Sequence, residues 1–217
     1  MDIQALNPTA ILLLKTAERL FALHGIDSVS TRQIAREAGQ KNHSALQYHF
    51  GSRDDLVDAI LAYRMAKANQ RRAELWTIVE TQGRLDDIRS LVMLIVQPLA
   101  EELLQAPQES YYIGLIAQLY SRDQAERVYL QDRDFFDTAR AVSSRLALQL
   151  AEVPEALLFE RLIFLGSQLV HAVADWDFQR RDGRLQLDTQ MLQRKVNNLV
   201  DFLAGGLTAP ISTGALL

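Results

Sequence analysis

Cysteine is absent from this chain of 217 residues. Disulfide bonds, thiol nucleophiles and cysteine ligands for a metal are therefore excluded. Glycine and proline are sparse, with 10 and 5 residues, while hydrophobic residues make up 48% of the chain. This balance predicts an all-α globular protein that is long enough to bury a substantial core.

Long apolar runs are missing as well. The longest, residues 91–96, is far shorter than the roughly 20 apolar residues that a membrane-spanning helix needs. The N-terminus shows no basic stretch followed by an uninterrupted apolar run, so we expect no secretory signal. We therefore expect a cytoplasmic protein without a membrane partner.

The net charge is −4 at pH 7, which by itself argues against a nucleic-acid-binding protein. The charges are unevenly distributed, however. Between residues 28 and 53 four basic residues face one acidic residue, whereas the chain from Met65 onward carries more acidic than basic residues. A locally basic segment on an acidic body is typical of a small DNA-reading module joined to a larger sensing or assembly domain. A solvated pair of helices carries such charges too.

Residues 30–53 predict two short helices joined by a tight turn. Ser30 and Gln33 have the spacing of a capping box, and Gly39 stands where a helix ends in a left-handed residue. In the second helix Leu46 and Phe50 lie four apart on one inward face. The other side carries hydrogen-bonding groups, namely Asn42, His43, Ser44, Gln47 and Tyr48. This arrangement is typical of a helix-turn-helix whose second helix enters a DNA major groove.

Further helices are predicted on both sides of this motif. Asn7 and Pro8 are typical of a helix start, and Gly25 of its end. We expect this first helix to complete a small core made of Phe21, Ile34, Leu46 and Phe50. Ser52 and Asp55 predict another capped start, and the apolar pattern that follows extends towards Val79. A helix of that length would connect the small module to the next domain.

The order of these motifs resembles the DNA-binding domain of the TetR family of transcriptional regulators. Phe-Ala-Leu-His-Gly (21–25) is followed by Ser-Thr-Arg-Gln-Ile-Ala-Arg-Glu-Ala-Gly (30–39), by a helix ending in Tyr-His-Phe (48–50), and by Gly-Ser-Arg (51–53). The resemblance covers about residues 7–61. Between Gly39 and Phe50 the chain is one residue longer than the common family pattern, which leaves the start of the recognition helix open between Gln40 and His43.

The resemblance implies a set of DNA contacts around a double-stranded operator. The first helix of the motif would contribute phosphate or base contacts, the second would touch phosphates and base edges, and Arg53 would clamp a phosphate. The implied DNA-binding residues are Thr31, Arg32, Lys41, Asn42, His43, Ser44, Gln47, Tyr48, His49 and Arg53. Physical chemistry supports these roles, because Gln and Asn pair with adenine, Arg with guanine or phosphate, and helix N-termini with phosphate. Tyr48 and His49 have an alternative role as partly buried packing residues.

The second half of the chain shows helical periodicity and few other signals. We expect helices over residues 85–104, with a kink or a split at Pro98, and over 110–120, 135–150, 154–180 and 189–203, followed by a frayed tail at 208–217. The resemblance implies that the last two long helices form a dimer interface. The candidates are Leu158, Leu162, Leu165, Leu169, Leu199 and Phe202. The same leucines could instead close the core of one chain.

The middle helices could enclose a pocket for a largely apolar small molecule. Candidate residues combine aromatic or flexible bodies with polar tips, as ligand pockets do. They are Trp76, Met93, Tyr111, Tyr112, Gln118, Phe135, His171 and Trp176. Each of them could equally be a core or interface residue.

Catalysis and metal binding find no support in the sequence. There is no glycine-rich phosphate loop, nucleophile elbow or acidic metal loop. His43 and His49 are six residues apart and cannot share one face of a helix, so no metal site is expected there. We expect neither a cofactor nor catalytic residues.

Together these patterns predict a DNA-binding domain over residues 1–51 and a helical effector-binding and dimerisation domain over 52–207. The predicted function is a ligand-responsive transcriptional regulator, a repressor, that binds a palindromic operator as a homodimer and is released by a small-molecule effector. One alternative is a constitutive dimeric DNA-binding protein without a ligand. Another is a helical scaffold or ligand-binding protein without a DNA function.

Overall fold

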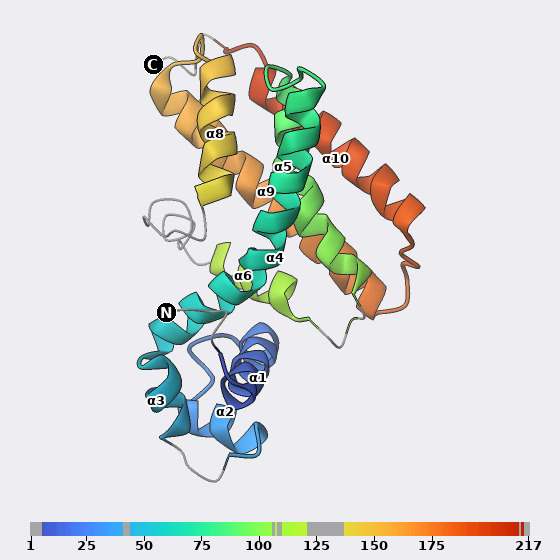
Figure 1. Cartoon of the computed structure of the whole chain (residues 1–217). Coiled ribbons are helices and arrows are strands. Elements are labelled where there is room, and N and C mark those ends of the chain that lie inside the picture. Colours follow the sequence, from blue (N-terminus) through green and yellow to red (C-terminus); the bar gives the residue numbers. More distant parts are fainter. Residues whose placement is uncertain are drawn as a thin grey trace.

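The computed structural model describes residues 6–40, 44–105, 107, 110–120, 137–212 and 214. These residues form helices and no strand, which confirms the all-α prediction (Figure 1). The helices are α1 (Pro8–His24), α2 (Thr31–Glu37), α3 (Ala45–Phe50), α4 (Arg53–Thr81), α5 (Ile88–Ala100), the 3₁₀ helix η2 (Glu101–Leu104), α6 (Tyr112–Tyr120), α8 (Asp137–Gln149), α9 (Glu155–Arg181) and α10 (Thr189–Thr208).

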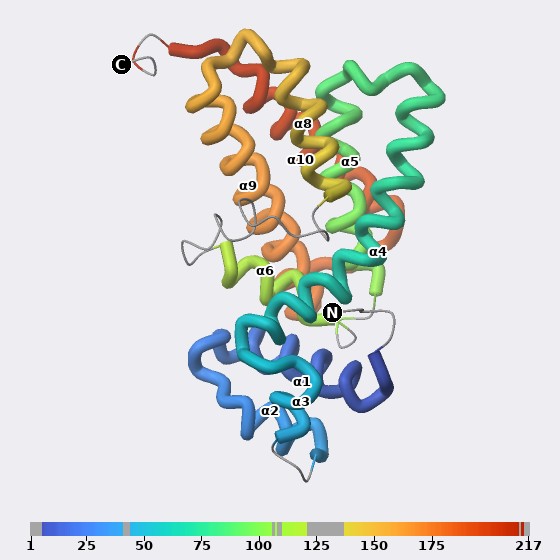
Figure 2. Tube along the Cα trace, turned by 60° about the vertical axis from the view of Figure 1, so that its left-hand side comes forward, coloured from blue at the N-terminus to red at the C-terminus, as the bar shows by residue number. Residues whose placement is uncertain are grey.

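Helices α1, α2 and α3 form a small module at one end of the molecule (Figures 1 and 2). The Asn7 side chain accepts a hydrogen bond from the Ala10 amide at 2.9 Å and Pro8 opens α1, as predicted. The predicted core is also confirmed, because each of its members is at most 3% exposed: Phe21, Ile34, Leu46 and Phe50. This core fixes the two short helices of the motif against α1.

Helix α4 connects the module to the rest of the molecule. It has 29 residues, so it is about 43 Å long at 1.5 Å per residue. The predicted capping box at its start is present: the Asp55 amide donates to Ser52 Oγ at 3.1 Å, and the Ser52 amide donates to Asp55 Oδ2 at 3.0 Å. The first turns of α4 pack on α1 and α3, and later turns pack on α5 and α8. The predicted mechanical link is therefore one continuous helix.

The helices after α4 form a larger body (Figure 1). Helix α10 packs along α5, and α6 packs on both α9 and α1. Helix α6 lies between the small module and the body (Figure 2). The helix expected from residue 85 begins at Ile88 instead, because the Asp87 side chain accepts from the Arg89 and Ser90 amides and caps it there.

Two other boundaries differ from the sequence prediction. Helix α5 is not split at Pro98 but continues to Ala100, and the chain then tightens into η2. Helix α10 continues five residues past Leu203 to Thr208, although it contains two glycines there. Arg161 holds this end, since its guanidinium donates to the backbone oxygens of Leu207 at 2.6 Å and Ala209 at 2.8 Å.

A buried ion pair joins the module to α4. Glu18 of α1 is 1% exposed and Arg64 of α4 is 9% exposed. The Arg64 guanidinium donates to both Glu18 oxygens, at 2.6 and 2.8 Å. Burial lowers the pKa of the Arg64 guanidinium, but the bonds to Glu18 outweigh this and raise the pKa above its ordinary value. The Arg64 guanidinium therefore stays charged, and its burial depends on the hydrogen bonds to Glu18.

We predict that Glu18→Ala destabilises the protein strongly. The substitution leaves the Arg64 charge buried without its partner, which costs about 3–5 kcal/mol of the free energy of unfolding. Urea denaturation followed by circular dichroism measures the loss. Arg19→Ala is a matched control on the neighbouring position, because the Arg19–Glu37 pair is exposed and solvent already screens it. Equal small losses in the two variants would contradict the prediction.

Candidate DNA-binding site and ligand cavity

The turn between α2 and α3 has the geometry of a helix-turn-helix. Gly39 adopts a left-handed conformation with φ +69°, which an L-residue with a side chain rarely tolerates. The Gly39 amide donates to the Arg36 oxygen at 3.0 Å and the Gln40 amide to the Ala35 oxygen at 2.9 Å. These bonds end α2 and turn the chain towards α3.

Helix α2 is held in place from both ends. At its start the Gln33 amide donates to Ser30 Oγ at 3.1 Å, which is one half of the predicted capping box. The Gln33 side chain lies close enough to Glu37 to lower the pKa of that carboxyl, and no bond from it back to the Ser30 amide is found among the described residues. At its end Glu37 accepts from Arg19 of α1 at 2.7 Å, and this hydrogen bond lowers the pKa of the Glu37 carboxyl.

Four of the predicted DNA contacts form an exposed polar face on the motif. Tyr48 is 85% exposed, and Arg32, Ser44 and Gln47 are also exposed. Thr31 and Arg53 are half-buried first residues of α2 and α4, where free backbone amides favour a phosphate group. These positions stay predictions of DNA contact. Lys41, Asn42 and His43 lie outside the described residues.

The surroundings of His49 are compatible with both of its predicted roles, DNA contact and packing. Its ring meets the Tyr48 ring edge-on at 5.1 Å between centroids, and the Phe50 ring at 6.1 Å. The side chain is half-buried. Because Phe50 belongs to the core, His49 supports the exposed Tyr48 ring from the core side.

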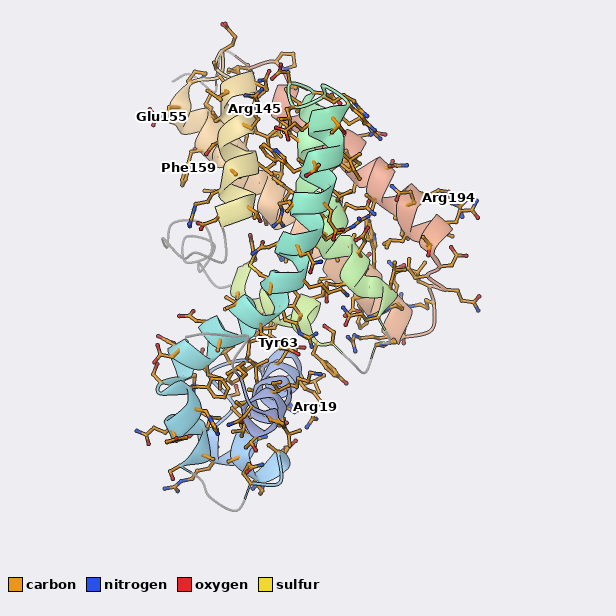
Figure 3. All side chains as sticks on the ribbon, in the orientation of Figure 1. Arg19, Tyr63, Arg145, Glu155, Phe159 and Arg194 are labelled. Carbon is orange, nitrogen blue, oxygen red and sulfur yellow. The ribbon has the colours of Figure 1, made fainter. Side chains whose placement is uncertain are left out.

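A polar cleft lies between α1 of the module, α4 and η2. It has a volume of about 620 Å³ and its wall includes Glu18, Arg64, Glu102 and Tyr111. Arg19 and Tyr63 also line it and lie at the junction of the two parts (Figure 3). Burial raises the pKa of the Glu102 carboxyl, which lies 3.8 Å from the Lys67 ammonium. Charged groups from α1 and α4 thus face each other across this junction.

A second, mostly apolar cavity of about 120 Å³ lies inside the body. Helices α4, α5, α6, α8 and α9 all contribute to its wall. Leu61, Met65 and Ala68 come from α4, and Ile116 comes from α6. Two arginines line it as well, Arg72 and Arg140. The cavity is therefore in contact with the helix that reaches the DNA-binding module.

The residues predicted for a ligand pocket are scattered in the structure. Tyr112 lines the apolar cavity, whereas Tyr111 lines the polar cleft. Gln118 donates to the Ala22 oxygen of α1 at 2.7 Å. Trp176 carries the Lys195 ammonium over its ring at 5.1 Å. Trp76 and Met93 are half-buried against the core, His171 is exposed, and Phe135 lies outside the described residues.

Sequence reasoning missed Arg72 as a cavity residue. The only signal available was the adjacent pair Arg71 and Arg72, whose side chains must point in different directions on a helix. Arg71 is bound to Glu101 on the outside, and Arg72 is buried. No group of His, Asp or Glu side chains within the described residues has the arrangement of a metal site.

The residues predicted for a dimer interface are mostly covered by their own chain. Leu165 and Leu169 are 4% exposed and line the cavity, and Leu199 is 8% exposed. Leu158 and Leu162 are half-buried. Phe202 alone among the six is exposed, at 67%. Phe202 belongs to α10, and two aromatic side chains of α9 are similarly exposed, Phe164 at 60% and Phe178 at 61%.

Comparison with protein families matches both parts of the chain. Residues 13–60 match the family model of bacterial regulatory proteins, tetR family. Residues 94–206 match the tetracyclin repressor-like C-terminal domain. No individual curated protein matches the chain. The first match covers α1 to the first turns of α4, and the second covers the body from the middle of α5 to α10.

We predict that Arg32→Ala weakens binding to duplex DNA of any sequence. A phosphate contact releases about one counterion, so its loss lowers the slope of log affinity against log salt concentration by about one. Fluorescence anisotropy with a labelled random duplex at several salt concentrations measures the slope. Arg84→Ala is the matched control, because Arg84 is an exposed arginine in the turn at the far end of α4. An unchanged slope for Arg32→Ala would contradict the prediction.

Proposed function

We propose, because this chain belongs to the TetR family of transcriptional regulators, that it is a ligand-responsive repressor in the bacterial cytoplasm. As a homodimer it binds a palindromic operator, and a small-molecule effector releases it. One observation carries this proposal: a single continuous helix, α4, joins the exposed polar face of the helix-turn-helix to an internal cavity. A constitutive DNA-binding protein would have no need for that cavity.

The exposed face of α9 supports dimerisation. Leu157, Phe164, His171 and Phe178 recur every seventh residue, which places them on one stripe of the helix. Among the described helices α9 is the one long and apolar enough to cross a membrane, yet only 28% of its most apolar window is buried within the chain. Figure 2 shows α9 along one side of the body. A second copy of α9 packed against this stripe would cover the exposed phenyl rings.

A dimer is also what DNA recognition requires. One helix-turn-helix contacts a short site and gives a small interface. Two of them spaced by one turn of DNA, about 34 Å, read a palindrome with useful affinity. The symmetry of the operator would then mirror the symmetry of the protein.

Release by an effector follows from the contacts of α4 and α6. Both helices line the cavity, and both are bonded to α1 of the DNA-binding module. A ligand that binds one arrangement of these helices better than another shifts the population towards it. The DNA-binding module then moves with α4 and α6, and this movement changes the spacing between the two recognition helices of the dimer.

Selection of DNA from a random-sequence pool tests the proposed function directly. We expect enrichment of a palindrome whose half-sites lie one DNA turn apart. Gln47→Ala should relax the preference at one base pair of each half-site by about 1–3 kcal/mol, because an amide side chain reads a base edge with two hydrogen bonds. Arg84→Ala should leave the selected sequence unchanged. Sequence-blind binding, or no binding by a folded dimer, would refute the proposal.

We predict that Phe164→Glu converts the dimer to a monomer. A carboxylate on the stripe would have to be buried without a partner in the dimer, which is unfavourable. Sedimentation equilibrium at several concentrations measures the change. Leu23→Glu, on α1 and 55% exposed, is the control and should remain dimeric. A Phe164→Glu dimer as tight as the unmodified one would place the interface elsewhere.

A further inference from the structure

Arg72 is a buried cation to which no residue in the described part of the chain supplies an acidic partner. Its side chain is 5% exposed. Nε donates to the Leu94 oxygen at 3.1 Å, and Nη1 donates to Asn69 Oδ1 and Thr138 Oγ1 at 2.8 Å each. All three partners are neutral, and no carboxylate of the described residues pairs with this guanidinium. Burying a charge without a counter-charge is costly, which sets Arg72 apart from an ordinary structural arginine.

The other buried arginine of α4 shows the usual solution. Arg64 is 9% exposed and is paired with both oxygens of Glu18. Arg71, next to Arg72, is paired with Glu101 and Glu74. Only Arg72 of these three lines the apolar cavity. The arginine that has no carboxylate partner among the described residues is thus the one that lines the cavity.

A second hydrogen-bond donor lines the same cavity. Tyr112 is 4% exposed, and its hydroxyl has no hydrogen bond to any described residue. Arg72 Nη2 likewise has none. The two residues are close enough for each to affect the pKa of the other, and both belong to the cavity wall. An aliphatic surface from Leu61, Leu99 and Leu169 forms much of the remaining wall.

Both groups keep their protons at neutral pH. Burial lowers the pKa of the Arg72 guanidinium to about 10, which still leaves it charged at pH 7. Burial raises the pKa of the Tyr112 hydroxyl, so this group stays a donor. The polar part of the cavity therefore offers one positive charge and two donors, which suits an anion and repels a cation.

We propose that the cavity binds a small monocarboxylic acid with an apolar body, whose carboxylate is held by Arg72 Nη2 and the Tyr112 hydroxyl. This inference rests on the proposed function, since it names the chemical class of the effector. A cavity of about 120 Å³ is close to one that holds a benzene ring, so the apolar body is about that size. Arg140, which also lines the cavity, already has Asp137 as its partner.

Isothermal titration calorimetry with matched acid and amide pairs tests the inference without DNA. The probes are benzoate against benzamide, and hexanoate against hexanamide. We expect at least one acid to bind about 10- to 100-fold more tightly than its amide, because the amide lacks the charge that a buried guanidinium requires. Acids that bind no better than their amides, or do not bind at all, would overturn the inference.

Two pairs of variants locate the site. Arg72→Gln and Tyr112→Phe should each weaken binding of the acid, by about 10- to 100-fold for the arginine and less for the hydroxyl. Arg71→Gln and Tyr111→Phe are the neighbouring controls, outside the cavity, and should leave the affinity unchanged. Because Arg72 also ties α4 to α5 and α8, Tyr112→Phe and Arg72→Lys serve if Arg72→Gln does not fold. Unaltered acid binding in Tyr112→Phe and Arg72→Lys would overturn the inference.

Measuring whether acids and amides release the selected operator distinguishes this inference from the proposed function. Acid binding that depends on Arg72 supports the carboxylate site whether or not the DNA is released. Release of the operator by the amides as well as by the acids would overturn the inference and leave ligand-responsive repression intact. Failure to select any operator would refute the proposed function and leave the calorimetric result standing.

Discussion

The buried carboxylate of Glu18 determines how the two parts of this molecule fit together. Its Oε2 accepts from Arg64 Nε at 2.6 Å, and its Oε1 accepts from Arg64 Nη2 at 2.8 Å and from the Tyr111 amide at 2.7 Å. Three segments therefore meet at one side chain: α1, α4 and the start of α6. A charge in such a place is tolerated only while its partners stay in position. The orientation of the DNA-binding module is thus tied to polar geometry as well as to apolar packing.

In α4 and at the start of α6, the residue that follows a partner of Glu18 lines the cavity. On α4, Arg64 bonds Glu18 and Met65 lines the cavity. Ahead of α6, the Tyr111 amide bonds Glu18, and the next side chain, Tyr112, lines the cavity. Because neighbouring residues of a helix point in different directions, the same short segments face the module on one side and the cavity on the other. A change in the cavity therefore needs no long path to reach α1.

Local signals were enough to predict the DNA-binding module. Caps at Asn7 and Ser52, the left-handed turn at Gly39, and the inward faces of Leu46 and Phe50 depend on residues within a few positions of each other. Such interactions can be read from the chain because helix ends and helix faces follow fixed spacings. The return bond expected from Gln33 to Ser30 did not follow that rule, because the Gln33 side chain interacts with Glu37, one turn further along the same helix.

The cavity and the exposed stripe could not be predicted in the same way. Arg71 and Arg72 look alike in the sequence, and only the packing of α5 and α8 against α4 decides that Arg72 is buried. Leucines in steps of three and four along α9 indicated an interface, yet its own chain covers Leu165 and Leu169. The exposed residues Phe164 and Phe178 belong to a second stripe of α9 with seven-residue spacing, and the sequence does not tell which of the two apolar faces the chain itself covers. Tertiary contacts decide between covered and exposed apolar faces.

The composition of the cavity matches the energy that a switch requires. Moving a two-state protein from 1:99 to 99:1 needs a difference of about 5.5 kcal/mol in ligand affinity between the two states. One hydrogen bond to a charged group contributes about 1.5–3 kcal/mol, and burial of roughly 100 Å² of apolar surface contributes about 2.5 kcal/mol. Neither contribution reaches the required value alone, but together they approach it. In the proposed mechanism, a carboxylic acid in this small cavity would combine the Arg72 charge with the apolar walls, and a ligand with only one of these features would shift the equilibrium less.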